Sequence, residues 1–146
     1  MGRVLAAAAK GPRGSADKAL LSLRKRHPRL VVQLVALKEL PSSKAVMMIG
    51  EQTLRATKTG ALLATKAEVD LLLRLAGTTQ ISVAIEKAGY RSHGKMMLVA
   101  AGASTDVAVL RAELAADGAY TILEEDELTD AGRSMVEEAA LLGTRS

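Results

Sequence analysis

The sequence predicts an α/β protein of the α+β type, in which about six helices cover a four-stranded, mixed and largely antiparallel sheet. Four short apolar segments with strand character alternate with longer segments whose apolar residues recur at intervals of three and four. The resulting order along the chain is β-α-β-α-α-α-β-α-β-α. At 146 residues, the chain predicts a single domain over residues 1–146, which can bury about 70% of the surface that its unfolded form exposes.

Two strands and two helices are expected in the first part of the chain. Residues 3–9 read as a strand, although alanine has a low strand propensity. The helix that follows must end before Pro28, because the residue ahead of a proline is pushed out of the helical region. Residues 30–37 are apolar and β-branched, which is typical of a central strand covered on both faces. Pro41 and two serines then start a helix that reaches about Lys58.

Residues 65–89 predict two helices that meet at a corner. Thr65 and the glutamate three residues later form a capping-box pattern at the start of the first helix. Apolar residues then recur at i, i+3, i+4 and i+7 and predict one buried face on each helix. Gly77 is expected to end the first helix in the left-handed conformation, and Thr78 or Thr79 to cap the second.

The last third of the chain predicts two further strands and two helices. Residues 95–101 and 119–123 are the expected strands, separated by a helix that Ser104 helps to cap. The final helix reaches Leu142 and has an acidic outward face. Gly132 within this helix costs about 1 kcal/mol relative to alanine, which indicates close approach of another backbone.

Composition argues against several classes of site. The chain has no cysteine, which excludes disulfides, thiolate zinc sites and thiol nucleophiles and fits a cytoplasmic location. It has no Phe or Trp and only two Tyr, which argues against RNA-binding modules that stack bases on aromatic platforms. No apolar run approaches a membrane-spanning length, so no membrane partner is expected.

Catalytic and metal-binding patterns are also weak, and we expect no catalytic residue, metal or cofactor. His27 and His93 have no acidic neighbour in sequence to orient them. Residues 89–95 resemble a phosphate-binding loop, but Met96 replaces its Ser or Thr, and the loop follows a helix instead of a strand. The acids of residues 124–127 are explained by their position at a helix N-terminus. A small-molecule enzyme is therefore the weakest hypothesis.

Charge is distributed unevenly along the chain. Residues 1–66 carry 13 Lys and Arg against 3 acids, or +10, residues 96–146 carry 3 against 10, or −7, and residues 67–95 carry +1. This asymmetry predicts one side that faces a polyanion, with residues 24–26 in a basic patch, and an opposite acidic side. The alternative is that the two parts interleave in the folded chain and that their charges pair.

The corner also carries a resemblance to a known family. Its helix with the pattern Glu-x-x-Leu-Leu, from Glu68, runs into Ala-Gly-Thr-x-Gln-Ile-x-x-Ala-Ile-x-x-x-Gly, from Ala76. This pattern resembles the small kinase-binding subunit of the archaeal KEOPS complex, which makes threonylcarbamoyladenosine in tRNA, over residues 45–99. The resemblance implies a non-catalytic subunit that binds the small atypical kinase of the complex and helps to recruit tRNA by its single-stranded 3′ CCA end.

The same corner supplies the candidate RNA-binding residues. The resemblance implies that the tRNA 3′ end is held near the motif, while the role of Thr79 stays open. Free backbone N–H groups at the start of the second helix would favour a phosphate, and Arg74 is expected to face solvent beside them. The candidate residues are Arg74, Gly77, Thr78, Gln80 and Ile81, with Lys58 and Lys66 as nearby charge.

A second candidate surface is apolar. Leu71, Leu75, Met47 and Leu54 lie off the best-supported buried faces, so we expect some of them to pack on a helix of the kinase. The alternative function is that of a protein-only adaptor or regulator of a kinase, with no direct RNA contact, whose charge asymmetry serves docking.

Overall fold

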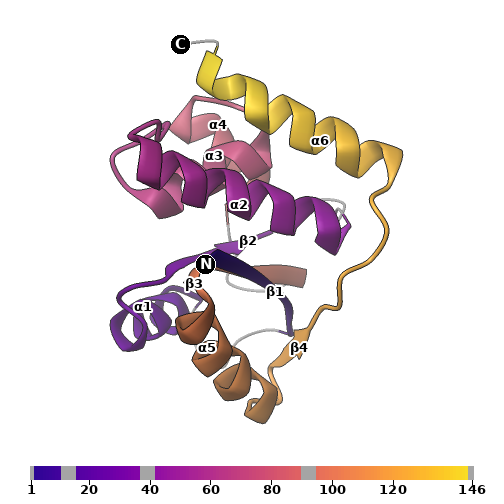
Figure 1. The fold of residues 1–146 in the computed structure, drawn as a ribbon. Coiled ribbons are helices and arrows are strands. Elements are labelled where there is room, and N and C mark those ends of the chain that lie inside the picture. Colours follow the sequence, from indigo (N-terminus) through magenta and orange to yellow (C-terminus); the bar gives the residue numbers. More distant parts are fainter. Residues whose placement is uncertain (1, 11–15, 37–41, 90–94, 145–146) are drawn as a thin grey trace.

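A four-stranded antiparallel sheet lies at the centre of the molecule and carries helices on both faces (Figure 1). The structure is a computed structural model, and it describes residues 2–10, 16–36, 42–89 and 95–144. The expected α/β class and order of elements are confirmed. The elements are β1 (Gly2–Lys10), α1 (Ala16–Arg26), β2 (Val31–Val35), α2 (Ser43–Thr59), α3 (Ala67–Ala76), α4 (Ile81–Ala88), β3 (Lys95–Ala103), α5 (Ser104–Ala116), β4 (Tyr120–Ile122), α6 (Asp130–Leu141) and η1 (Leu142–Thr144).

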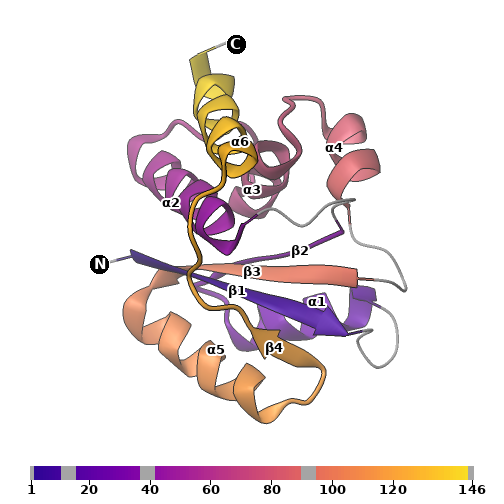
Figure 2. The ribbon, with the colours of Figure 1, turned by 90° about the vertical axis from the view of Figure 1, so that its right-hand side faces the viewer.

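The helices form two layers, one on each face of the sheet, and each layer has its own apolar core. One core joins α1 and α5 to one face of the sheet, and the other joins α2, α3, α4 and α6 to the opposite face (Figure 2). Alternation along β1 explains this arrangement, because Leu5 and Ala7 belong to the first core whereas Ala6 between them belongs to the second. The sheet is thus the middle layer of three.

The strand order corrects one expectation. The strands lie in the order β2-β3-β1-β4, so β2 is an edge strand and not a central one. Both faces of β2 are covered as expected, since its burial is nearly complete. Its outer edge is covered too: the Arg24 guanidinium donates to the Val32 carbonyl oxygen at 2.8 and 3.0 Å, and Ala36 N–H donates to Ala88 O at 3.0 Å. The apolar sequence of β2 therefore correctly indicated that the strand is buried. Its outer edge is covered by the Arg24 side chain and by the backbone of residue 88, and not by a second long strand.

Helices α2 and α6 pack closely at the start of each helix. The Ser42 hydroxyl accepts the Ala45 N–H at 3.1 Å, and Asp126 accepts the N–H groups of Ser43 and Lys44 at 3.2 and 3.0 Å. A Cβ atom added to Gly132 would lie 3.1 Å from Ala45 Cβ. The atoms that approach this glycine belong to side chains and not to a backbone as expected, and the glycine lies in the first turn of α6 because the helix begins only at Asp130.

Some sequence-based predictions fall outside the described residues. These are the positions of His93, of most of the phosphate-loop-like segment and of Pro41, which lie in residues 90–94 and 37–41. Among the helices that the structure describes, none combines the length and the apolar character needed to cross a bilayer.

Candidate nucleic-acid interface

The corner between α3 and α4 is a tight and well-defined turn. Gly77 has φ 71°, as expected for a left-handed residue that ends a helix. The Thr78 N–H donates to Leu73 O at 3.2 Å, and the Thr78 hydroxyl accepts the Gln80 N–H at 3.1 Å. The Thr78 side chain therefore shapes the turn and does not cap α4, whose N-cap is Gln80 and whose first residue is Ile81.

The predicted capping box at the start of α3 does not form. The helix begins at Ala67, so Lys66 is the N-cap residue and Thr65 lies one position too early to accept the N–H groups of the first turn. The Lys66 side chain makes no capping hydrogen bond. A carboxylate of the first turn is used differently: Asp70 Oδ2 accepts the Leu63 N–H at 2.9 Å and so fixes the loop that enters the helix.

A buried polar network ties this part of the fold together. The Asp70 carboxylate is fully buried, and its Oδ1 accepts the Thr53 hydroxyl of α2 at 2.6 Å and Arg74 Nε at 2.8 Å. Arg74 also donates to the Ala139 carbonyl oxygen of α6 at 3.2 Å. Asp70 and Arg74 together therefore link three helices, α2, α3 and α6.

Arg74 is consequently not the solvent-facing residue that we expected. It is 5% exposed, and its guanidinium is committed to Asp70 and to α6. The physical reason is the carboxylate one turn earlier on the same helix face, together with α6, which covers both side chains. Arg74 cannot reach an RNA at the surface, and it positions the helix that leads to the corner.

The candidate kinase-binding leucines of α3 are also part of the core. Leu71 is 0% exposed and Leu75 is 3% exposed, so neither offers a surface to a partner. The reason is that α3 is surrounded by β2, α2, α4 and α6, and not covered on one side only. The other two candidates, Met47 and Leu54 of α2, are half-buried and keep part of their surface.

The exposed residues of the corner motif form an apolar row along α4. Ile81 is 51% exposed and Ile85 is 52% exposed, one turn apart, and Thr79 and Gln80 before them are also exposed. Other motif positions, such as Ala84, are buried and serve the core. The fold therefore explains only part of the motif.

A groove continues this row toward the edge of β2. Its volume is about 470 Å³, and its wall combines apolar side chains with charged ones. The lining residues are Arg24, Gln33, Lys66, Glu68, Val69, Leu72, Ile85 and Gly89. Lys66 is exposed at this groove, whereas Lys58 is exposed at the last turn of α2 and is not among the groove residues. Of the two lysines expected near the corner, only Lys66 is brought to the exposed row.

The electrostatics at the corner are mixed. A Cβ atom added to Gly77 would lie 3.6 Å from Glu138 Oε1, so a carboxylate of α6 stands beside the turn. Because a carboxylate repels phosphate, the corner favours a base or ribose over a phosphate at this point.

Basic residues of the first half pair with acids of the last third. Arg26 Nε lies 2.6 Å from Glu113, Arg29 lies 2.6 Å from Asp106, and Lys44 pairs with Glu125. The halves thus interleave at these three positions, and Arg24 is half-buried against β2. The polyanion-facing side expected from charge counting is smaller than the sequence suggested.

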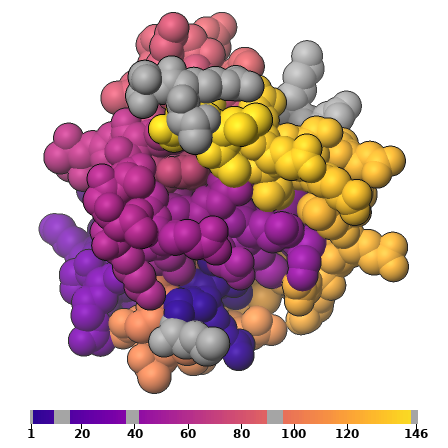
Figure 3. Space-filling model, turned by 45° about the horizontal axis from the view of Figure 1, so that its top comes forward, coloured from indigo at the N-terminus to yellow at the C-terminus, as the bar shows by residue number. Residues whose placement is uncertain are grey.

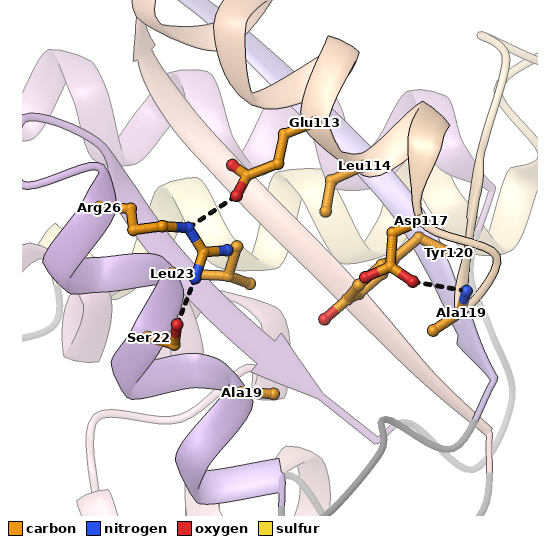
Figure 4. Close-up of a pocket in the computed structure, with 9 residues that line it drawn as sticks. All are labelled: Ala19, Ser22, Leu23, Arg26, Glu113, Leu114, Asp117, Ala119 and Tyr120. Atoms are coloured by element: carbon orange, nitrogen blue, oxygen red, sulfur yellow. Dashed lines mark hydrogen bonds and ion pairs between the residues drawn. The ribbon is translucent and has the colours of Figure 1, made fainter.

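A separate cluster of charged groups lies between α1 and α5 (Figure 4). Glu113 receives Arg26 on one oxygen and lies 2.5 Å from His27 Nε2 on the other. Burial disfavours the charged form of Glu113, but the hydrogen bond to His27 and the charge of Arg26 outweigh burial and hold the pKa of Glu113 below its ordinary value. Burial, with Asp117 nearby, raises the pKa of Tyr120 in the same cleft. Sequence reasoning missed the acidic partner of His27 because 86 residues separate the two.

This cluster connects the end of α1 to α5 through side-chain hydrogen bonds and an ion pair. Arg26 also donates to the Ser22 hydroxyl within α1, so its guanidinium bonds to both helices. Within the described ranges, no group of three or more His, Cys, Asp and Glu side chains is arranged to hold a metal ion.

Comparison with known proteins adds no family to these observations. No family model matches the chain, and none of the curated proteins compared with it is detectably similar.

Proposed function

We propose that this chain is a non-catalytic subunit of a KEOPS-type complex, which binds the small atypical kinase of the complex and recruits tRNA by its 3′ CCA end for threonylcarbamoyladenosine modification. The observation that carries the RNA part is the exposed pair formed by Ile81 and Ile85. These two apolar side chains are 51% and 52% exposed, one turn apart at the corner motif, and so offer an apolar contact surface that the core does not use.

The corner suits a terminal nucleotide in three respects. Gly77 and the Thr78 hydroxyl fix the path of the turn, so the exposed residues are held in one arrangement. The first N–H groups of α4 have no acceptor inside the helix and are available to a ribose oxygen. Ile81 offers an aliphatic surface to a base, and Lys66 adds positive charge along the row. Arg74 supports this site from within the core.

A protein-only adaptor is the second candidate, and the charge pairing favours it. Arg26, Arg29 and Lys44 are engaged by acids, and Glu138 stands beside the corner. An adaptor would use the Ile81–Ile85 row to pack on the kinase instead of on RNA. Kinase binding itself rests on the family resemblance and is tested by co-expression of the two proteins and size-exclusion chromatography, where separate elution contradicts it.

Filter binding to whole tRNA and to tRNA trimmed of its CCA end separates the two candidates. We expect Ile81→Ala to weaken binding to whole tRNA about tenfold, equivalent to about 1.4 kcal/mol, and to leave binding to trimmed tRNA unchanged. Val109→Ala is the matched control, since Val109 is 63% exposed on α5 and distant from the motif in sequence.

Two outcomes contradict the RNA proposal. If wild-type protein binds neither RNA at low salt, the adaptor remains. If Ile81→Ala weakens binding to both RNAs equally, the 3′ end is not held at the corner. Circular dichroism of both variants confirms that each is folded, which we expect because both side chains are half exposed or more.

A further inference from the structure

One side of helix α2 keeps accessible surface beside the start of β1. Its residues are Lys44, Met47, Met48 and Glu51, whose spacing of i, i+3, i+4 and i+7 places them on one helix face, here called the α2 stripe. All four line a hollow of about 560 Å³ that also includes the first residues of β1. Figure 3 shows α2 at the surface between the start of β1 and α6. The buried residues of α2, such as Ile49, belong to its other sides.

The two methionines of the α2 stripe offer apolar surface outside the cores. Met47 is half-buried at the margin of the core beneath α2, and Met48 is half-buried and belongs to neither core within the described residues. Half-buried Val4 and Leu123 line the same hollow. Methionine side chains are flexible and adapt to the surface of a partner. The stripe therefore has an apolar middle between two charged ends.

The charges around the hollow are balanced in number. Lys44 pairs with Glu125 and Arg111 with Glu124, and all four side chains are 39% exposed or more. Exposed pairs of this kind contribute little to stability and can exchange partners. A strongly acidic or strongly basic partner would leave one sign unmatched, so the balance favours a partner whose own charges are balanced. The charged lining residues are Arg3, Lys44, Arg111, Glu51, Glu124 and Glu125.

The order of residues along the α2 stripe selects such a partner. The methionines stand between a cation and an acid, and Lys44 and Glu51 are equally far from the midpoint between residues 47 and 48. Two copies of α2 that run antiparallel about this midpoint place Lys44 of each copy opposite Glu51 of the other, with the methionines between these pairs. A parallel pair would instead set lysine against lysine and glutamate against glutamate, where like charges repel. The stripe thus has the self-complementarity that a two-fold contact between identical chains requires.

We infer that this chain forms a homodimer in which α2 of one copy packs antiparallel on α2 of a second copy through the α2 stripe. Exposed Glu51 forms no ion pair within the described residues, so it can accept Lys44 of the second copy. The contact is independent of the proposed RNA site, whose exposed Ile81 lies on α4. It assigns Met47, a candidate for kinase binding, to a contact between copies.

Exchange of the two charges tests the inference. Sedimentation velocity of the wild type over a range of concentrations should show a species of twice the chain mass of 15.3 kDa. Lys44→Glu sets glutamate against Glu51 of the second copy, and Glu51→Lys sets lysine against Lys44, so each variant alone should weaken the dimer about tenfold or more. An equimolar mixture of the two variants should dimerise again, because a heterodimer restores both pairs of opposite charge.

The control carries the same charge change on the other face of the sheet. Lys25→Glu alters an exposed lysine of α1, which packs on the opposite layer, and should leave the dimer unchanged. Circular dichroism confirms that each variant is folded, as expected because Lys44 and Glu51 are both in contact with solvent.

A single cysteine locates the contact. The chain has no cysteine, so Met48→Cys introduces one thiol near the proposed two-fold axis. Mild oxidation should link two copies, because a disulfide forms only where two Cα atoms come within about 7 Å. Ala108→Cys, at an exposed position of α5, is the control and should not link. Wild-type protein that stays monomeric at millimolar concentration, a mixture that dimerises no better than either variant alone, or equal linkage at both cysteine positions would each overturn the proposal.

Discussion

Replacing Asp70 with alanine tests whether the buried network holds the corner helix in place. The substitution removes the partner of Arg74, whose side chain is 6% exposed, and the acceptor of both the Thr53 hydroxyl and the Leu63 N–H. Breaking a buried ion pair by deleting one partner costs about 3–5 kcal/mol. A domain of this kind has a total free energy of unfolding of about 5–15 kcal/mol. Asp70→Ala should therefore remove a large part of the stability of the protein.

Urea unfolding followed by circular dichroism measures this loss. Glu137→Ala is the control, since this exposed glutamate on α6 should change the free energy of unfolding by no more than about 0.5 kcal/mol. The double variant Asp70→Leu with Arg74→Met removes both charges and should be less destabilised than Asp70→Ala, because no unpaired charge stays buried. A loss below about 1 kcal/mol for Asp70→Ala would refute the assignment of the network as a structural anchor.

Three further predictions follow from burial and charge. Leu71→Ala should cost about 2–5 kcal/mol in urea unfolding because the side chain is fully buried, and a smaller loss would mean that α3 is less enclosed than described. Glu138→Gln should strengthen binding to whole tRNA, because it removes the carboxylate beside the corner. Glu137→Gln is the control and should have a smaller effect. Weaker tRNA binding by Glu138→Gln would contradict the placement of the 3′ end at the corner. Because His27 and Arg26 hold the folded pKa of Glu113 below its ordinary 4.5, its stabilising contribution is present above pH 4.5 and is lost as the pH falls through the lower folded value. The stability difference between wild type and Glu113→Gln should thus shrink in acid. A difference that grows in acid would mean that the folded pKa of Glu113 is raised and not lowered.

Local patterns predicted the end of α3 and part of its buried face, because these depend on neighbouring residues, but they did not predict the caps of α3 and α4. The end of α3 at Gly77 follows from conformational preference, and Leu72 and Leu73 are buried as their spacing indicated. The error over Leu71 and Leu75 has a different origin. Periodicity shows which residues share a face, but it does not show how many faces of a helix are covered by elements distant in sequence.

The burial of Arg74 had a partial signal in the sequence. Asp70 stands four residues before it, which is the spacing of an acid–base pair on one helix face. That spacing occurs equally on exposed helices, so it indicates the pair but not its burial. Burial depends on α6, whose Ala139 carbonyl oxygen accepts from Arg74 across 65 positions of the chain.

The edge position of β2 in the sheet and the pairing of charges could not be predicted from the sequence, because local patterns do not show contacts between distant segments. Both depend on contacts between remote segments, such as Arg26 with Glu113, which are separated by 87 positions. Charge counting gave the correct totals for each segment but treated the segments as separate surfaces. In the folded chain, α1 and α5 lie on the same face of the sheet, so Arg26 at the end of the basic helix α1 becomes a neighbour of Glu113 on α5.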